Sequence, residues 1–236
     1  STLKAGMYWY DLQKAELKQL HEGKSKYKYK GLAISEDGTQ TSFLLDSDTT
    51  KAPNHFYSLY YWKTGEATAS ALVHDKTTQV PANWFVSEHT TPNFSKDGSK
   101  LFFGLAPKPL VQDTTRLEEE IIKVEVWNWR DSVLQTQQNS RLEVEKKRSY
   151  QTAINLADKS IALLGGTTVP QIVLADEGNA AIALGLSDLP YRWSNFYDVN
   201  TAEDAYLIEV KTGNKNKVAE KVKGNISISP KAKFVY

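Results

Sequence analysis

A short turn between two apolar runs recurs along the chain, and this repeat constrains the fold more than any other feature. Its clearest copy is NFSKDGSKLFFGL at residues 93–105, and a second is GLAISEDGTQTSFLL at residues 31–45. In both copies a serine and an aspartate can hydrogen-bond their own backbone, and a glycine supplies the positive φ that a tight turn needs. Each copy therefore predicts a β-hairpin. The turn residues are Ser35, Asp37, Gly38, Ser95, Asp97 and Gly98.

Two weaker copies of the turn begin at residues 175 and 229, so the four turns are 60, 80 and 54 residues apart. A second type of hairpin, with the turn Lys-Thr-Gly at residues 63–65 and 211–213, follows the first type. Residues 7–20 have the same strand-turn-strand layout, although their second half also fits a short helix. Two hairpins in succession form a four-stranded antiparallel sheet, which is the blade of a β-propeller. We therefore predict an all-β chain, a β-propeller fragment built from such blades.

The phase of the repeat divides the chain into about three full blades and two half-blades. The full blades are expected at about residues 31–73, 90–165 and 170–220, and the half-blades at residues 7–20 and 225–236. We treat residues 1–236 as one partial-propeller domain and expect it to be a piece of a longer propeller, because common propellers have more blades. A small ring, closed by pairing of the two half-blades, is the alternative. Without that pairing, raw strand edges predict homo-oligomers or aggregation.

Composition argues against several classes of function. The chain has 29 basic and 28 acidic residues, a balance that argues against general nucleic-acid binding. No apolar run reaches the roughly 18 residues of a membrane-spanning helix, so membrane insertion is not expected. Residues 1–14 lack the apolar core of a signal peptide, although a removed leader stays compatible with the sequence. Cysteine is absent and the 4 histidines have no metal-ligand spacing, so we predict no metal and no cofactor.

The second full blade contains the least repetitive sequence. Strict alternation over residues 123–129 (KVEVWNW) predicts a half-buried strand. We expect Trp127, Trp129 and Asp131 to stabilise the blade through core or inter-blade packing, and a platform on which a ligand stacks is the less favoured interpretation. Residues 135–147 are polar and fit either a helix or a long exposed strand. The proline at the start of residues 190–195 (PYRWSN) favours a loop there.

Together these motifs resemble the propeller domain of the prolyl oligopeptidase family, and its dipeptidyl-peptidase-like branch in particular. The Ser-x-Asp-Gly repeat alone is shared by many propellers, whereas VEVWNWRDSVLQTQQ at residues 124–138 is more specific. ALGLSDLPYRW at residues 183–193 resembles the same branch. Ala175 and Ala232 depart from the usual turn serine and glycine, which weakens two turns without changing the resemblance.

The resemblance implies that the chain is the N-terminal propeller of a serine peptidase and is not itself catalytic. In that family the propeller covers an α/β-hydrolase domain, whose Ser-Asp-His triad has its serine in a Gly-x-Ser-x-Gly elbow. The chain contains no such elbow. The implied partners are the C-terminal hydrolase domain of the same parent chain and a peptide substrate. The implied roles are to restrict access to the active site and to contact substrate, in a periplasmic or secreted rather than cytoplasmic protein.

Two segments are candidates for substrate contact. The resemblance implies that propeller glutamates hold the free α-amino group of a peptide, and Glu118, Glu119 and Glu120 are the candidates here. A solvated acidic face is the more common role of such a run. Arg192, beside Tyr191, can stack on aromatic rings and bind a carboxylate, or can face the hydrolase domain. Anchoring of the loop is the favoured alternative for this pair.

Two other functions fit a propeller of this kind. One is a free-standing interaction scaffold, and the other is a periplasmic propeller of the translocation type, which uses similar Ser-x-Asp-Gly repeats. The Trp-Asn-Trp-x-Asp segment at residues 127–131 favours the peptidase-type propeller over both.

Overall fold

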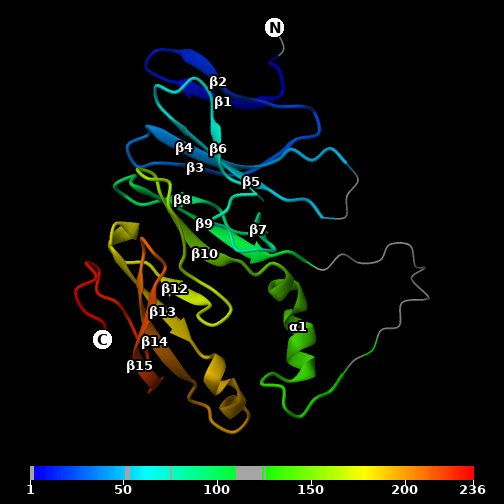
Figure 1. Ribbon diagram of the computed structural model, residues 1–236, viewed down its shortest axis with the longest axis vertical. Helices are drawn as coiled ribbons and strands as arrows, with labels where there is room; N and C mark the ends of the chain where they lie inside the picture. Colours follow the sequence, from blue (N-terminus) through cyan, green and yellow to red (C-terminus); the bar gives the residue numbers. More distant parts are fainter. Residues whose placement is uncertain (1–2, 51–53, 75, 110–123, 125) are drawn as a thin grey trace.

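The computed structural model describes residues 3–50, 54–74, 76–109, 124 and 126–236, and this part of the chain is built mainly of β-strands. The strands form three larger antiparallel sheets and one two-stranded sheet, which follow one another in sequence order (Figure 1). Each larger sheet is made mostly of consecutive strands, as the hairpin repeat predicts. The fold is therefore part of a β-propeller, and the predicted fold class is confirmed.

The first full blade contains β3 (Lys28–Ile34), β4 (Gln40–Asp46), β5 (Ser58–Lys63) and β6 (Ser70–Val73), paired in that order. All 7 residues of β4 are buried, whether apolar or polar. A strand in the middle of a sheet has both edges paired, and here both faces are also covered, so burial does not alternate along it.

The second blade contains β7 (Trp84–Val86), β8 (Asn93–Phe94), β9 (Lys100–Pro107), β10 (Tyr150–Asn155) and β11 (Ile161–Leu163). Both β7 and β8 pair with β9, at opposite ends of that long strand. The connection from β9 to β10 contains helix α1 (Gln135–Lys146). The polar segment that fitted either a helix or an exposed strand is therefore a helix.

The third blade contains β12 (Gln171–Val173), β13 (Ile182–Ser187), β14 (Ala202–Glu209) and β15 (Lys215–Lys223). Two 3-10 helices lie in its connections, η2 (Asp176–Gly178) between β12 and β13, and η3 (Leu189–Phe196) between β13 and β14. The segment that was expected to be a loop at residues 190–195 is thus mostly η3.

The two half-blades lie apart and do not pair with each other. Strands β1 (Gly6–Asp11) and β2 (Glu16–Glu22) pair with each other in a separate sheet, so the second half of the first hairpin is a strand. Near the other end of the chain, an isolated bridge joins Ile228 to Val235. Figure 1 shows these two hairpins at separate ends of the stack. The closed small ring is therefore not the arrangement in this structure.

Adjacent phenylalanines in β9 show how the blades are joined. Phe102 and Phe103 are 1% and 0% exposed. Phe102 belongs to an apolar cluster with Ile208 and Val210 of the third blade, whereas Phe103 belongs to a cluster with Leu44 of the first. Successive side chains of a strand point to opposite faces, so one strand contributes to both inter-blade cores. The apolar run LFFGLA is the sequence of a sheet covered on both faces.

The Ser-x-Asp-Gly turns have the geometry that their sequence predicts. Ser95 Oγ donates to Asp97 Oδ1 at 2.6 Å and accepts the backbone N–H of Lys100 at 2.9 Å. Gly98 has a φ of 67°. The first copy repeats these contacts through Ser35, Asp37 and Gly38.

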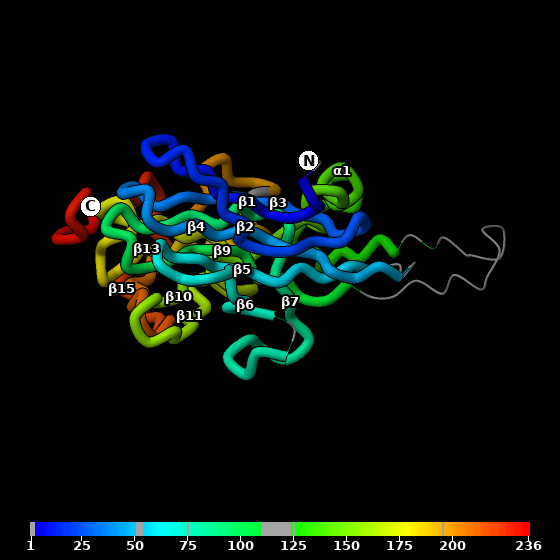
Figure 2. The backbone as a smooth tube through the Cα atoms, turned by 90° about the horizontal axis from the view of Figure 1, so that it is seen from above, coloured from blue at the N-terminus to red at the C-terminus, as the bar shows by residue number. Residues whose placement is uncertain are grey.

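Successive turns also contact one another, a link between blades that the sequence does not reveal. Hydrogen bonds join turn one to two, two to three, and three to four. Among them are those from the Gln40 side chain to the Gly98 carbonyl (3.1 Å), from the Lys96 N–H to the Glu177 carbonyl (3.1 Å), and from the Asp176 N–H to the Pro230 carbonyl (2.6 Å). The turns lie at one edge of the molecule, at the left in Figures 1 and 2, whereas α1 lies at the opposite edge.

The third and fourth turns, in which Ala175 and Ala232 replace the usual serine and glycine, have non-glycine residues with a strained, positive-φ backbone. Ala175 has no hydroxyl to hold its turn, and the next residues, Asp176 and Glu177, both have positive φ values of 51° and 54°. Ala232 has a φ of 54° at the position where the other turns have glycine. An L-residue in this left-handed region is disfavoured by roughly 1–2 kcal/mol because its Cβ crowds the backbone.

Replacing Ala232 with glycine is expected to raise the free energy of unfolding by up to about 1 kcal/mol. Relief of the left-handed strain outweighs the greater chain entropy that glycine loses on folding. Urea denaturation measures the change. The control is Ala157→Gly, at an exposed turn position outside the positive-φ set, where the same substitution should lower stability. A less stable Ala232→Gly variant would contradict this explanation.

Candidate functional site

Helix α1 is a polar helix at the edge of the propeller, and none of its residues is buried. It forms because good helix formers fill it and because Glu143 pairs with Lys146, three residues later, at 2.8 Å. The Gln138 side chain donates to the Val133 carbonyl at 2.8 Å, which joins the first turn to the segment before it. Figure 2 shows the helix beside the sheets rather than between them.

A pocket of about 430 Å³ lies between α1, the segment before it and η3. This volume is within the range of roughly 300–1000 Å³ that is typical of ligand pockets. Three arginines line it, Arg141 and Arg148 from α1 and the residues after it, and Arg192 from η3. Two acidic side chains, Asp131 and Glu145, also line it, so the ionised lining carries an excess of one positive charge.

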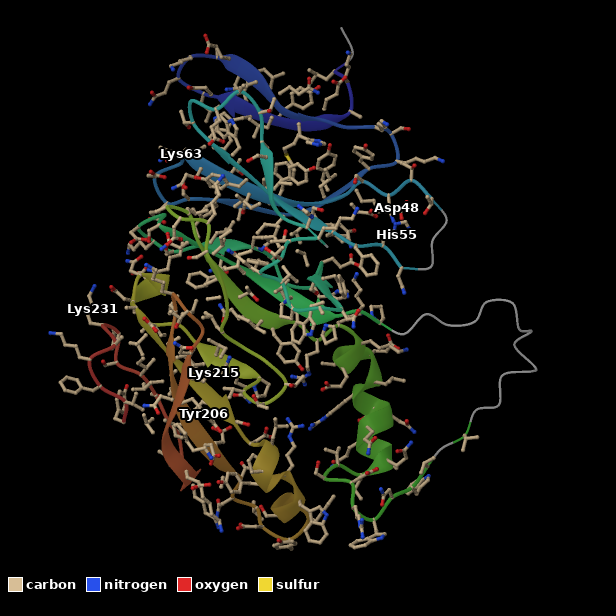
Figure 3. All side chains as sticks on the ribbon, viewed as in Figure 1. Asp48, His55, Lys63, Tyr206, Lys215 and Lys231 are labelled. Carbon is tan, nitrogen blue, oxygen red and sulfur yellow. The ribbon has the colours of Figure 1, made fainter. Side chains whose placement is uncertain are left out.

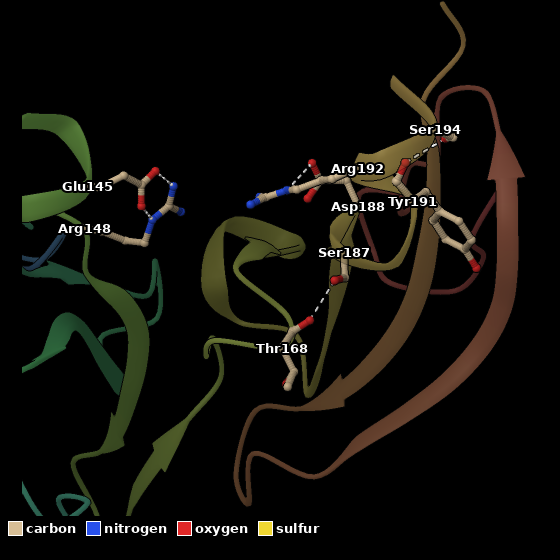
Figure 4. A network of polar contacts seen from close by, with 8 residues as sticks. All are labelled: Glu145, Arg148, Thr168, Ser187, Asp188, Tyr191, Arg192 and Ser194. Carbon is tan, nitrogen blue, oxygen red and sulfur yellow. Dashed lines mark hydrogen bonds and ion pairs between the residues drawn. The ribbon is translucent and has the colours of Figure 1, made fainter. Parts of the chain in front are cut away.

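Arg148 is held in the pocket by a two-pronged contact with Glu145. Its Nε and Nη2 donate to the two carboxylate oxygens (Figure 4). These hydrogen bonds lower the pKa of Glu145, and the nearby charges of Arg192 and Arg141 contribute in the same direction. The carboxylate is therefore ionised near neutral pH and fixes the plane of the guanidinium.

Arg192 and Arg141 retain hydrogen-bonding capacity. The Nε of Arg192 donates to Asp188 at 3.0 Å, and its other two nitrogens make no hydrogen bond to a described residue. Figure 4 shows Arg148 and Arg192 pointing toward one another across the gap. Arg141 makes no hydrogen bond or ion pair with the described residues. Converging guanidinium groups of this kind suit a carboxylate or another planar anion.

Tyr191 anchors the loop and does not line the pocket. Its hydroxyl donates to Asp204 Oδ1 of β14 at 2.6 Å, and this hydrogen bond raises the pKa of Tyr191 to about 12. Asp204 is fully buried and also contacts the Lys217 ammonium at 2.7 Å. The sequence pair Tyr191–Arg192 therefore divides its roles, since Tyr191 fastens η3 to the sheet and Arg192 reaches the pocket.

The structure does not place the predicted tryptophans in a blade. Trp127 and Trp129 are 67% and 77% exposed and lie outside any strand. The expected core packing is therefore not seen for either side chain. Trp129 instead lies under the Arg130 guanidinium, 5.0 Å from the ring centre. Asp131 lines the arginine pocket and accepts a hydrogen bond from Gln138 at 3.3 Å.

The remaining predictions concern the acidic run, metal binding and membrane insertion. Glu118, Glu119 and Glu120 lie outside the described residues. Within the described ranges, no group of three or more histidine, cysteine, aspartate or glutamate side chains is arranged to hold a metal ion. In the same ranges, no helix is long and apolar enough to span a membrane.

Sequence reasoning missed Arg141 and Arg148. Arg141 lies in α1, whereas Arg148 lies two residues after the last helical residue, Lys146, so no helical period links the two arginines in the sequence. Their separation from Arg192 in the sequence gives no indication that the three arginines lie close together in space. The net charge of the whole chain is close to zero, so it does not reveal the local excess of positive charge in this pocket.

Comparisons with known proteins were made on both sequence and structure. No family model matches the chain, and no curated protein matches it in sequence. Solved structures that it resembles include TolB from Acinetobacter baumannii (12% identity, TM-score 0.33) and the tricorn protease (10%, 0.39). Another is an acylaminoacyl peptidase from Pyrococcus horikoshii (8%, 0.37).

These alignments cover 97%, 97% and 83% of this chain, in the same order, but only 41%, 22% and 25% of the other chains. The chain thus spans less than half the length of each of these proteins. Sequence identities and TM-scores this low give no information about function. The propeller fold is instead established by the arrangement of the sheets in this structure.

Proposed function

We propose that the chain is the non-catalytic propeller part of a serine peptidase of the prolyl-oligopeptidase type, in which it limits access to the active site and contacts the substrate. The observation that carries this proposal is the convergence of Arg141, Arg148 and Arg192 on one pocket. The pocket is formed by the two insertions, α1 and η3, that depart from the regular blade. A peptide offers such a pocket a terminal or side-chain carboxylate.

The sequence motifs support the same proposal. The VEVWNWRDSVLQTQQ segment that carries the resemblance leads directly into α1, and ALGLSDLPYRW contains the start of η3. Both specific motifs thus border the arginine pocket. The His21 ring contacts the Tyr29 hydroxyl at 2.9 Å. The proposed role is accordingly one of substrate contact, with the chemistry supplied by an attached hydrolase domain.

The first test is the intact mass of the natural gene product and its labelling by a fluorophosphonate probe. A product well above 26.5 kDa that labels on serine is expected. A product near 26.5 kDa that does not label would exclude a peptidase, and an interaction scaffold would be the better description.

In the labelled parent enzyme, Arg192→Gln is expected to raise KM about tenfold or more with a smaller change in kcat. The variant removes a charge-assisted hydrogen bond worth roughly 1.5–3 kcal/mol, and a contact equally strong in the ground and transition states affects mainly KM. The matched control is Arg130→Gln, an exposed arginine that does not line the pocket. Equal kinetics for both variants and the wild type would show that the pocket does not contact substrate.

A further inference from the structure

A second and larger cavity, of about 1070 Å³, lies on the same side of the molecule as α1. Its walls come from β3, from the residues before β5, from β7 and the residues after it, and from the ends of β9 and α1. Figure 3 labels His55, which lines this cavity. The cavity meets the arginine pocket at Glu145 and Arg148, which line both. Its volume is at the upper end of the range for ligand pockets.

Aromatic rings form much of the wall of this cavity. Phe56 and Phe85 pack edge to face with their ring centres 5.1 Å apart. The Lys108 ammonium lies 5.1 Å from the ring centre of Phe56, and the Lys30 ammonium lies 5.7 Å from that of Tyr57. Apolar or aromatic groups of a ligand can therefore be buried next to positive charge.

Positive charge exceeds negative charge around the cavity. Five cationic side chains line it, against the two carboxylates Glu88 and Glu145. The cationic residues are Lys28, Lys30, Lys108, Lys146 and Arg148. Three of them are paired at the wall or beside it, Lys30 with Glu88, Arg148 with Glu145, and Lys146 with Glu143.

Two lysines make no side-chain hydrogen bond to a carboxylate of the described residues. The Lys108 ammonium makes no ion pair with a described carboxylate, and it lies over the Phe56 ring. Lys28 lies 3.8 Å from Asp46, which is too long for a hydrogen bond. Asp46 is fully buried, and its Oδ2 also lies 3.0 Å from His55 Nδ1. Lys28 lies in β3 and Lys108 directly follows β9, so these two charges come from different parts of the cavity wall.

We propose that this cavity binds an acidic peptide segment in which carboxylate side chains alternate with apolar or aromatic ones. Lysines from different parts of the wall can pair with several carboxylates along an extended peptide, and the aromatic rings can contact the apolar or aromatic side chains of the peptide that lie between those carboxylates. A nucleotide phosphate would instead favour donors that converge on one point, such as a glycine-rich loop at a helix N-terminus. The proposal does not depend on an attached hydrolase domain, so it can stand or fall apart from the proposed function.

The test is fluorescence anisotropy of the full chain with a labelled Glu-Phe-Glu-Glu-Phe-Glu peptide, compared with its Gln-Phe-Gln-Gln-Phe-Gln twin. The acidic peptide is expected to bind at least about tenfold more tightly at low salt. Raising the salt from about 20 mM to about 300 mM should remove most of that preference, because it shortens the screening length.

Lys108→Gln should weaken binding of the acidic peptide about three- to tenfold, since the lysine has no carboxylate partner among the described residues. Lys63→Gln is the matched control, an exposed lysine at the turn edge of the molecule (Figure 3). Equal binding of the two peptides would overturn the proposal, as would equal loss in both variants. Displacement by ATP at a lower concentration than by unlabelled acidic peptide would also overturn it, in favour of a phosphate site.

Discussion

Replacing Phe102 or Phe103 with alanine is expected to lower the free energy of unfolding by about 3–5 kcal/mol in each case. Both side chains are essentially fully buried, at 1% and 0% exposure. The two losses have separate causes, because Phe102 packs against the third blade and Phe103 against the first. Each variant therefore opens a cavity at a different inter-blade interface.

Denaturant unfolding of the two variants measures these losses, and Trp127→Ala serves as the control. Trp127 is also a large aromatic residue, but it is 67% exposed, so its removal should change stability by less than about 0.5 kcal/mol. A loss for Trp127→Ala as large as that for Phe102→Ala would mean that the tryptophan packs into a blade after all. A small loss for either phenylalanine would mean that the blades are joined more loosely than the structure shows.

Replacing Asp204 with alanine is expected to destabilise the fold by about 3–5 kcal/mol and to release η3 from the sheet. The buried carboxylate accepts the Tyr191 hydroxyl at 2.6 Å and the Lys221 N–H at 3.1 Å, and it contacts the Lys217 ammonium at 2.7 Å. Alanine leaves these three donors without their partner. Because Tyr191 fastens η3, the adjacent Arg192 should lose its fixed position as well.

The Asp204 effect should depend on pH. Burial alone would raise the pKa of this carboxyl, but Lys217, Tyr191 and the Lys221 N–H together hold it below its usual value. A lowered pKa in the folded state contributes stability above the unfolded-state pKa of about 3.9 and loses it as the pH falls through the folded-state value. The stability difference between wild type and Asp204→Asn should therefore be largest near neutral pH and shrink below about pH 4.

Urea titrations across this pH range test both statements, with Asp198→Ala as the control. Asp198 pairs with Lys223 at 2.6 Å but its side chain is 30% exposed, so the control should cost much less stability than Asp204→Ala. A difference between wild type and Asp204→Asn that stays constant from neutral to acidic pH would mean that Asp204 is not ionised in the folded protein.

Hairpins and their turns were predictable from sequence because the interactions that specify them are local. Ser95 reaches Asp97 and the N–H of Lys100 within the same turn, and Gly98 supplies the positive φ there. The strands after each turn can be recognised from their apolar runs, because the pattern of apolar residues within a short segment is enough to indicate a strand. The order of strands in the first and third blades then follows, because consecutive strands pair with their sequence neighbours there.

The exposed tryptophans show where a local pattern fails. Alternation over residues 123–129 fits a strand, but alternation does not supply a neighbouring strand to pair with, and Trp127 and Trp129 lie in no strand. The sequence could not distinguish a helix from a strand at α1. No residue of this helix is buried, so its sequence lacks the periodic apolar residues that mark an amphipathic helix.

By itself, the sequence determined the repeat, the turns, the all-β class and Arg192 as a candidate contact, because each depends on residues close together in the chain. Only the tertiary structure brought Arg141 and Arg148 to Arg192, separated Tyr191 from that pocket, and gathered lysines from β3, α1 and the residue after β9 around one cavity. Such sites arise from the way successive blades and their insertions pack. Packing joins residues far apart in the chain, and no periodicity within a short window records which of them will meet.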